Sequence, residues 1–313
     1  MGDRYLITGA TGFIGSNVVR ALVARKKHVS ILTRHKGIAP RLADIQGEFK
    51  QYTCDLLDPA LEKVVDNIRP TIIFHFAAFG VNPWETDFEK MVDVNIRGTS
   101  RLLGAAKKNG FRLFVHTGTS SEYGVKKRPM RETDFLEPVN DYGVTKAAAT
   151  LLCAKWALRE HLPIVTFRPF SPYGYFEHKK RLFPSIVRAA LSGSPILVAS
   201  RAHVRDFIFI DDVVDAYMKI VGKKISPGEV FNISMGKEKS VEDVVKRVVR
   251  ISHSKSKVVW GAVDDQGRQV EPVRWQGDIT KAKRLLGWAP RTTIDMGIKK
   301  LIAWTKTHHE LYD

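Results

Sequence analysis

Tyr142 and Lys146 have side chains whose types and spacing suit proton transfer. Residues four apart on a helix share one face, so the phenol and the ammonium would be neighbours. A phenol with a reference pKa of about 10 is a poor base near neutral pH, and a neighbouring ammonium stabilises its phenolate. Upstream, residues 117–124 (TGTSSEYG) hold hydroxyls that could hydrogen-bond a substrate oxygen. These residues predict acid/base chemistry on a hydroxyl or carbonyl group, although Tyr-x-x-x-Lys alone also occurs on surface helices.

A glycine-rich turn near the start of the chain could hold phosphate groups. Residues 8–15 read TGATGFIG, and Gly9, Gly12 and Gly15 follow a G-x-x-G-x-x-G pattern between an apolar strand and a helical stretch. Such glycines permit a tight turn and close approach to a pyrophosphate. The N-terminus of the following helix offers N–H groups and partial positive charge to that anion. The turn therefore predicts dinucleotide binding; a merely structural turn is disfavoured, because three glycines at a helix start cost stability.

The end of the next strand bears on the choice of cofactor. An acidic residue there would accept a hydrogen bond from the ribose 2′-hydroxyl of NAD, whereas an arginine accommodates the 2′-phosphate of NADP. In this chain the strand ends at Thr33 and is followed by Arg34, His35 and Lys36. We therefore expect NADP, with Arg34 as the partner of the 2′-phosphate. NAD remains the alternative, in which Arg34 and Lys36 are exposed loop charges.

These residues require an α/β framework to position them. Short apolar runs at 4–8, 28–33, 71–76 and 113–117 alternate with helical patterns at 14–23, 91–107 and 141–160. This alternation predicts a Rossmann doubly wound parallel sheet covered by helices. Prolines become frequent after the run at 163–169. We expect a dinucleotide-binding domain at 1–170 and a smaller substrate-binding lobe at 171–313, partly interleaved with the main sheet.

Composition limits the remaining classes of function. The 313 residues include 50 basic and 33 acidic side chains, a net charge of +17 that favours anionic partners. The basic residues are scattered in short groups, so nucleic acid is not the expected partner. No apolar stretch approaches the ~18 residues that a membrane span needs. The start of the chain has no signal-peptide pattern, and two cysteines provide no disulfide framework and no metal spacing. We expect a cytoplasmic protein with no metal site.

The chain resembles the extended short-chain dehydrogenase/reductases, the NAD-dependent epimerase/dehydratase family, nearly from end to end. Besides the glycine-rich turn, the segments that carry the resemblance are DL (55–56), FHFAAFG (74–80), VNIRGT (94–99), RPFSPYG (168–174), LFP (182–184) and VRDFIFIDDV (204–213). The resemblance implies that Thr119 is the catalytic hydroxyl and Tyr142 the acid/base. It implies that Lys146 lowers the pKa of Tyr142 and holds the nicotinamide ribose, and that Asn95 supports the active-site helix.

The turn, the second strand and the resemblance together imply two sets of binding residues. The cofactor set is Gly9, Thr11, Gly12, Phe13, Ile14, Gly15, Thr33, Arg34, Asp55, Leu56, Phe76, Ala77, Ala78, Asn95, Thr117, Tyr142, Lys146 and Pro169. The substrate set is Phe79, Ser120, Ser121, Ser171, Leu182, Arg205 and Arg268. Ser171 replaces the usual asparagine of the family, and Arg205 and Arg268 are the candidates for a pyrophosphate of the substrate.

The resemblance implies hydride transfer between a nicotinamide and a sugar carried on a nucleoside diphosphate. A 4,6-dehydratase would need acidic residues directly after Thr119, where this chain has Ser120 and Ser121, with Glu122 one place later. We favour a reductase of nucleoside-diphosphate 4-keto-6-deoxy sugars, because of the basic residues after the second strand. The segment TSSEYG (119–124) is also similar to that of GDP-4-keto-6-deoxymannose reductases. An NAD-dependent 4-epimerase is the alternative.

Two further expectations concern partners. The resemblance implies a homodimer in which the helices around 89–108 and 141–160 pair two subunits. A non-catalytic NADP-binding or RNA-binding protein on the same fold is the hypothesis from another class, and the intact set of Thr119, Tyr142 and Lys146 argues against it. His75 and His116 lie within strand patterns, and we expect them to be structural.

Overall fold

The centre of the protein is a parallel sheet of seven strands in the order β11-β6-β5-β4-β1-β2-β3. The computed structural model describes residues 2–37, 39–263, 274–308 and 310. The strands of the sheet are β1 (Arg4–Thr8), β2 (His28–Thr33), β3 (Lys50–Thr53), β4 (Ile72–His75), β5 (Leu113–Thr117), β6 (Ile164–Pro169) and β11 (Val230–Ile233). Every neighbouring pair is parallel. The carboxyl ends of all these strands therefore meet at one edge, as in a doubly wound fold.

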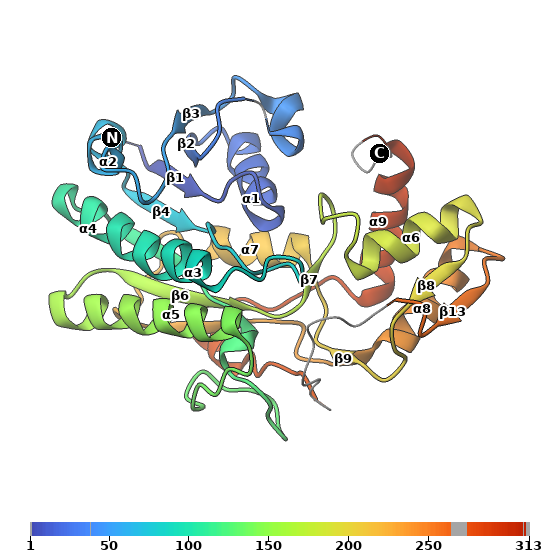
Figure 1. Ribbon diagram of the computed structural model, residues 1–313. Coiled ribbons are helices and arrows are strands. Elements are labelled where there is room, and N and C mark those ends of the chain that lie inside the picture. The colour runs from blue at the N-terminus through green and yellow to red at the C-terminus, as the bar shows by residue number, and fades with distance from the viewer. Residues whose placement is uncertain (1, 38, 264–273, 309, 311–313) are drawn as a thin grey trace.

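Helices cover both faces of this sheet (Figure 1). The first face packs against α1 (Phe13–Ala24) and α7 (Ile210–Ile220), and the second against α2 (Leu61–Ile68), α4 (Thr99–Asn109) and α5 (Asp141–Glu160). Successive strand residues point to opposite faces. Ile7, Phe74 and Val115 thus join the first core, and their chain neighbours Leu6, Ile73 and Phe114 join the second.

Short helical segments shape the loops at the sheet edge. They are η1 (Pro40–Ile45), α3 (Phe88–Met91), the π-helical segment η2 (Val92–Gly98) and the 3₁₀ turn η3 (Ser120–Glu122). π-helical turns inside helices are frequent at functional sites. η2 continues directly into α4 and carries Asn95.

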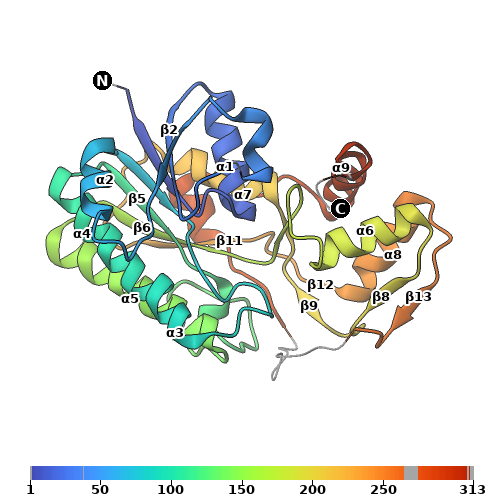
Figure 2. The same ribbon diagram turned by 45° about the horizontal axis from the view of Figure 1, so that its top comes forward.

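A smaller lobe stands to one side of the sheet, and Figures 1 and 2 agree on this arrangement. Its elements, and those that join it to the sheet, are β7 (Pro172–Tyr173), α6 (Leu182–Ser192), β8 (Ile196–Val198), β9 (Val204–Arg205), β10 (Ile208–Phe209), β12 (Lys239–Ser240), α8 (Val241–Ser252), β13 (Val258–Trp260), η4 (Ala282–Leu286) and α9 (Ile294–Thr307). Three two-stranded pairs form within it: β7 with β10, β9 with β12, and β8 with β13. Because α7 and β11 return to the main sheet, the chain after residue 170 serves both parts. The boundary near that residue stays a prediction.

The elements predicted from apolar periodicity agree with the structure, with instructive differences. The strand at 4–8 and the helix at 141–160 have the predicted bounds. The helical pattern at 91–107 runs through α3, η2 and α4 rather than one regular helix. No pattern predicts β3, because its residues KQYT are mostly polar and it forms the edge of the sheet. Within the described part of the chain, no helix is long and apolar enough to cross a membrane.

Aromatic packing joins β7 to the smaller lobe. The Tyr173 ring stacks on Phe183 of α6 with centroids 3.8 Å apart, and meets Phe209 edge to face. α9 closes over this group at Gly297, where an added Cβ would lie 2.1 Å from the Tyr173 hydroxyl. The close approach of α9 therefore depends on the absence of a side chain at this position.

The Gly297→Ala variant should accordingly be less stable than the wild type. Overpacking typically costs about 1–3 kcal/mol, which outweighs the helix propensity of about 1 kcal/mol that alanine gains over glycine. Urea unfolding followed by circular dichroism measures the difference. The matched control is Gly104→Ala in α4, where a Cβ would meet nothing closer than Trp156 at 4.0 Å. An equal loss of stability in both variants would contradict the steric explanation.

Candidate active site

The glycine-rich turn lies between the end of β1 and the start of α1. Gly9 has a φ of +64°, and a Cβ there would lie 2.5 Å from the backbone of Phe76 and Ala77. A Cβ on Gly15 would lie 2.2 Å from the Gly9 carbonyl oxygen. Gly12 is the N-cap of α1 and has no side chain to cap the first turn. This cradle, which side chains would fill, fits the pyrophosphate of a dinucleotide.

The loop after β2 carries the basic residues predicted to choose the cofactor. Arg34 is exposed and follows the buried Thr33, whose hydroxyl donates to the His35 carbonyl oxygen at 3.1 Å. Cys54, after β3, donates its N–H to the Thr33 carbonyl oxygen at 2.9 Å, so Asp55 and Leu56 lie beside the same strand end. The Asp55 carboxylate accepts the N–H of Leu57 at 2.8 Å. Arg34 is thus placed at the surface beside this strand end.

The segment after β4 lines the next part of the sheet edge. Phe76 donates its N–H to the Thr8 carbonyl oxygen at 3.1 Å, and Ala77 donates to the Thr8 hydroxyl at 3.3 Å. Ala78 and Phe79 continue this segment and are partly exposed. At the ends of the neighbouring strands, the Thr117 hydroxyl lies 2.7 Å from that of Tyr217, and Pro169 is buried. The predicted cofactor residues of β4, β5 and β6 therefore lie at the edge that carries the glycine turn.

Thr119 and Tyr142 come together at the carboxyl end of β5. Thr119 is the N-cap of η3, where its hydroxyl accepts the N–H of Ser121 at 3.2 Å. Burial and the charge of Glu122 raise the pKa of the Tyr142 phenol above its ordinary value, and a hydrogen bond with the Thr119 side chain opposes this rise. The catalytic hydroxyl and the acid/base predicted from the sequence are thus in contact.

Lys146 is buried one helical turn after Tyr142, on the inner face of α5. Burial lowers the pKa of the Lys146 ammonium to about 8, and the negative charge of Glu122 opposes this decrease. The Lys146 ammonium therefore loses its proton at a pH only slightly above neutral. A positive charge at this position can stabilise the phenolate form of Tyr142 while the phenol gives up its proton.

Asn95 connects the segment after β4 to the catalytic helix. Its amide oxygen accepts the N–H of Phe79 at 2.9 Å, and its amide nitrogen donates to the Phe79 carbonyl oxygen, also at 2.9 Å. The same nitrogen donates to the Thr145 hydroxyl at 3.0 Å. Asn95 is fully buried, so all of these bonds are shielded from water. The side chain thus bonds both the segment after β4 and α5, and its supporting role in the active site stays a prediction.

The predicted substrate residues lie around the catalytic turn and the smaller lobe. The Ser120 hydroxyl accepts a hydrogen bond from the Trp275 indole at 3.1 Å, and the Arg205 guanidinium stands 5.4 Å from the Trp275 ring centre. Ser171, before β7, has a φ of +27°, an uncommon and strained backbone conformation for a non-glycine residue. Leu182 begins α6. Arg268 lies outside the described residues.

Two loops meet beside this edge. The His178 ring packs against Trp84 at a tilt of 48° with ring centroids 4.8 Å apart, and the Lys180 ammonium lies 5.5 Å from the centre of the same indole. Glu85, next to Trp84, and Arg181, next to Lys180, are both close enough to Tyr142 to act on its pKa, Arg181 lowering it and Glu85 raising it. The loops at 79–90 and 175–183 therefore bring charged groups toward the catalytic phenol.

The strand histidines are buried, as expected from their positions. His75 lies between the hydroxyls of Thr8 at 2.6 Å and Thr99 at 2.9 Å. Burial and the charge of Lys146 lower the pKa of His75 to about 3, so its ring is neutral. His116 is also buried, and neither ring nitrogen has a partner among the described residues. Nor does that part of the chain contain a group of three or more His, Cys, Asp or Glu side chains that could hold a metal ion.

Some residues of the site carry no signal in the sequence. Trp275 is one of them, and it bonds Ser120 of the catalytic turn across 155 positions. Glu122 and Arg168 lie in segments that the sequence singled out, but their contact across 46 positions could not be found there. A search for motifs could have found Thr145, because it lies inside the Tyr-x-x-x-Lys segment. It could not have found Trp275, whose indole reaches Ser120 only through the return of the chain to the sheet.

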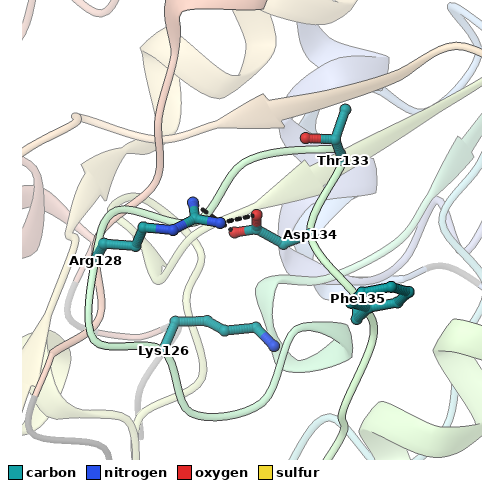
Figure 3. A pocket seen from close by; sticks show the side chains of 5 residues that line it. All are labelled: Lys126, Arg128, Thr133, Asp134 and Phe135. Atoms are coloured by element: carbon teal, nitrogen blue, oxygen red, sulfur yellow. Dashed lines mark hydrogen bonds and ion pairs between the residues drawn. The ribbon is translucent and has the colours of Figure 1, made fainter.

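One hollow on the surface lies away from these residues. It measures about 270 Å³ and is formed by the loop between η3 and α5 (Figure 3). Arg128 and Asp134 pair across it at 2.6 Å, and Lys126 pairs with Glu137. Phe135 on its rim is highly exposed. Its charged groups neutralise one another, and it contains none of the predicted catalytic residues.

Replacement of Asn95 by alanine should loosen α5. It would leave the Phe79 backbone groups and the Thr145 hydroxyl without their buried partner, at a cost of about 2–4 kcal/mol in the free energy of unfolding. Chemical denaturation measures this change. Asn109→Ala is the control, since its amide makes an exposed bond with Asp66, and surface substitutions usually change stability by less than about 0.5 kcal/mol. Similar losses in both variants would refute the bridging role.

Comparison with known proteins agrees with this geometry. The model of the NAD-dependent epimerase/dehydratase family matches residues 5–234. A Bacillus subtilis (strain 168) protein described as the uncharacterized UDP-glucose epimerase YtcB is 30% identical, over 98% of this chain and 99% of its own. Among solved structures, UDP-glucuronic acid 4-epimerase from Bacillus cereus, in complex with UDP-glucuronic acid and NAD, is 30% identical with a TM-score of 0.86, over 97% of this chain and 99% of its own. MoeE5, in complex with UDP-glucuronic acid and NAD, is 29% identical with a TM-score of 0.85, over the same shares. The chain thus belongs to the NAD-dependent epimerase/dehydratase family of extended short-chain dehydrogenase/reductases.

Proposed function

We propose that this protein transfers hydride between a nicotinamide dinucleotide and C4 of a sugar on a nucleoside diphosphate, with 4-epimerisation as its net reaction. The observation that carries this proposal is the assembly of Thr119, Tyr142 and Lys146 at the sheet edge that also carries the glycine turn. A bound nicotinamide supplies the hydride chemistry, accepting hydride from the sugar carbon and returning it.

The protein's own groups handle the proton. The phenol oxygen of Tyr142 takes the proton from the sugar hydroxyl as the carbonyl forms, and returns it when the hydroxyl is restored. The Lys146 ammonium stabilises the phenolate during this exchange. The Thr119 hydroxyl, already bonded to the phenol, is placed to orient the sugar oxygen. Tyr142 must act in both directions, which suits a reversible reaction.

In the family that the chain resembles, elimination of water by a 4,6-dehydratase uses acidic residues directly after the catalytic threonine. Ser120 and Ser121 occupy the positions after Thr119, and the nearest carboxylate is that of Glu122. That carboxylate is fully buried and bonded to Arg168 at 2.7 Å and to Thr150 at 3.0 Å. Because its oxygens are occupied, Glu122 is not placed to remove a proton from the sugar. This supports simple hydride and proton transfer over 4,6-dehydration.

The identity of the cofactor distinguishes two net reactions. The B. cereus epimerase and MoeE5 are both solved with NAD, which supports NAD and an epimerase that retains its cofactor. The sequence favours a 4-keto reductase that consumes NADPH, and this is the second candidate. It is supported by the exposed Arg34 after β2, where the strand end has no carboxylate of its own.

Purified protein incubated with UDP-glucose or UDP-glucuronic acid should yield the corresponding 4-epimer, detected by chromatography, with no net change in nicotinamide absorbance. The Tyr142→Phe variant should lose about 10²-fold or more in turnover, because it cannot exchange the proton. NAD should still be recovered when this variant is denatured and extracted, which shows that the folded variant had bound it and serves as the control for folding.

Other outcomes would replace the proposal. Stoichiometric loss of NADPH, but not NADH, with nucleoside-diphosphate 4-keto-6-deoxy sugars would establish the reductase. Absence of turnover with all of these sugars, together with steeply salt-dependent RNA binding, would favour the non-catalytic alternative.

We also propose a homodimer formed through α5. The face of this helix opposite the catalytic residues exposes Val144 (44%), Leu151 (61%) and Leu158 (64%). Successive positions are seven residues, or about two turns, apart, so they form one apolar stripe along about four turns of the helix. An apolar stripe of this kind on a long, otherwise well-packed helix is typical of a surface that pairs with another chain.

The Leu151→Glu/Leu158→Glu variant should sediment as a single chain, whereas the wild type should sediment as two. Burying two carboxylates at the centre of an apolar contact opposes association. Sedimentation velocity is the measurement, with circular dichroism to verify folding. Leu197→Glu is the control, because Leu197 is half exposed on β8 of the smaller lobe. A monomeric wild type, or a variant that stays dimeric, would exclude this interface.

A further inference from the structure

A buried ion pair lies directly beneath the catalytic turn. Glu122 is the last residue of η3 and is fully buried, and Arg168 of β6 is nearly so. The Arg168 Nε donates to one oxygen of the Glu122 carboxylate at 2.7 Å. Removing two charges from water is costly unless their hydrogen bonds are satisfied, so a pair in this position requires explanation.

The second carboxylate oxygen of Glu122 contacts two elements of the active site. It accepts the N–H of Thr119 at 2.8 Å and the hydroxyl of Thr150 at 3.0 Å. Thr150 lies one turn after Lys146 on α5. A Cβ on Gly118 would lie 2.4 Å from the same oxygen, so the backbone before Thr119 passes directly over the carboxylate. Glu122 therefore joins the catalytic turn to the catalytic helix.

Arg168 is held on its other side by the rest of the fold. Its Nη1 donates to the Tyr123 hydroxyl at 2.8 Å, and the guanidinium stands 4.5 Å from the centre of the Tyr123 ring. The Tyr123 hydroxyl in turn donates to the Asn232 amide oxygen of β11 at 2.7 Å. The ion pair is thus anchored to β6 and β11 and is shielded from water.

The charge of Glu122 acts on both catalytic groups. It raises the pKa of the Tyr142 phenol and opposes the effect of burial on the pKa of Lys146. The titratable or charged groups that interact with Lys146 from the elements around it are Glu122, Cys153, His75 and His116, with Arg168 acting on His116. The histidines are neutral and burial raises the pKa of the Cys153 thiol. Glu122 is therefore the anion of this set.

We propose that Glu122, fixed by Arg168, is a positioning residue that provides the buried counter-charge of Lys146 and orients Thr119, a role that rests on the proposed function. Its carboxylate is fully buried and bonded to Thr119, Thr150 and Arg168, so it acts through these residues. It keeps the ammonium charged in a dry environment, so that the cation is present beside Tyr142 when the phenolate forms. The same carboxylate sets the direction of the Thr119 backbone.

Titration of Lys146 itself tests the proposal without a substrate. Protein labelled with ¹³C at the lysine ε-carbons is followed by NMR against pH, and Lys146→Met identifies the signal. The wild-type midpoint should lie near 8. Glu122→Gln should move it downward by about one pH unit, since a nearby opposite charge shifts a pKa by about one or more.

Two further variants distinguish the effect of the Glu122 charge from the effect of its hydrogen bonds on the structure. Glu122→Gln leaves Arg168 without its partner, whereas Glu122→Gln/Arg168→Gln removes both charges and should give a midpoint between those of Glu122→Gln and the wild type. Thr150→Val removes one hydrogen bond to Glu122 but no charge, and should leave the midpoint of Lys146 unchanged. Equal midpoints in the wild type, Glu122→Gln and the double variant would overturn the proposal.

Turnover provides the second measurement. In Glu122→Gln, the alkaline limb of the kcat profile should move to lower pH together with the NMR midpoint, because Lys146 loses its proton earlier. In Thr150→Val the position of that limb should be retained. A wild type that turns over no nucleotide sugar would refute the proposed function alone, since the shift of the Lys146 midpoint would still establish the counter-charge. A limb that does not follow the midpoint would overturn the role of Glu122 in the reaction.

Discussion

The parallel direction of the central strands is the constraint on which the rest of the structure depends. Because every neighbouring pair in the sheet is parallel, the ends of β1, β4, β5 and β6 meet at one edge. The glycine turn follows β1, and the catalytic turn follows β5. Parallel strands need a crossover connection, which is usually a helix, and the crossover helix α5 between β5 and β6 brings Tyr142 and Lys146 to the same edge. Residues more than a hundred positions apart in the chain therefore share one site.

A second constraint is the polarity beneath this edge. His75, Asn95, Glu122 and Arg168 are all buried, which would be costly if their hydrogen bonds were not made. Asn95 makes three bonds and Glu122 accepts three. His75 joins β4 to β1 and α4, whereas Asn95 and Glu122 join loops of the sheet edge to α5. The polar layer holds the catalytic groups in place, whereas the apolar cores on either face mainly stabilise the fold.

The smaller lobe also participates in the catalytic turn. Trp275 donates to Ser120, and its ring lies against Arg205. Asp206, next to Arg205, accepts the N–H groups of Met235, Gly236 and Gly277 at 2.8 to 3.0 Å. This carboxylate ties together the loops of the lobe that lie nearest the sheet. Arg205, one of the two arginines predicted to contact the substrate's pyrophosphate, therefore lies next to this carboxylate and against the tryptophan that bonds the catalytic turn.

Local spacing in the sequence determined the apolar strands from β1 to β6, except the polar edge strand β3, together with the glycine turn and the spacing of Tyr142 and Lys146. Periodicity and helical geometry depend only on near neighbours in the chain. The sequence also indicated the family. The tertiary structure alone decided which groups surround them. Arg168 reaches Glu122 across 46 positions, and Trp275 reaches Ser120 across 155. Such contacts, the π-helical turn that carries Asn95 and the effect of burial on the pKa of Lys146 arise only when the sheet closes, since they depend on distance in space and on the exclusion of water.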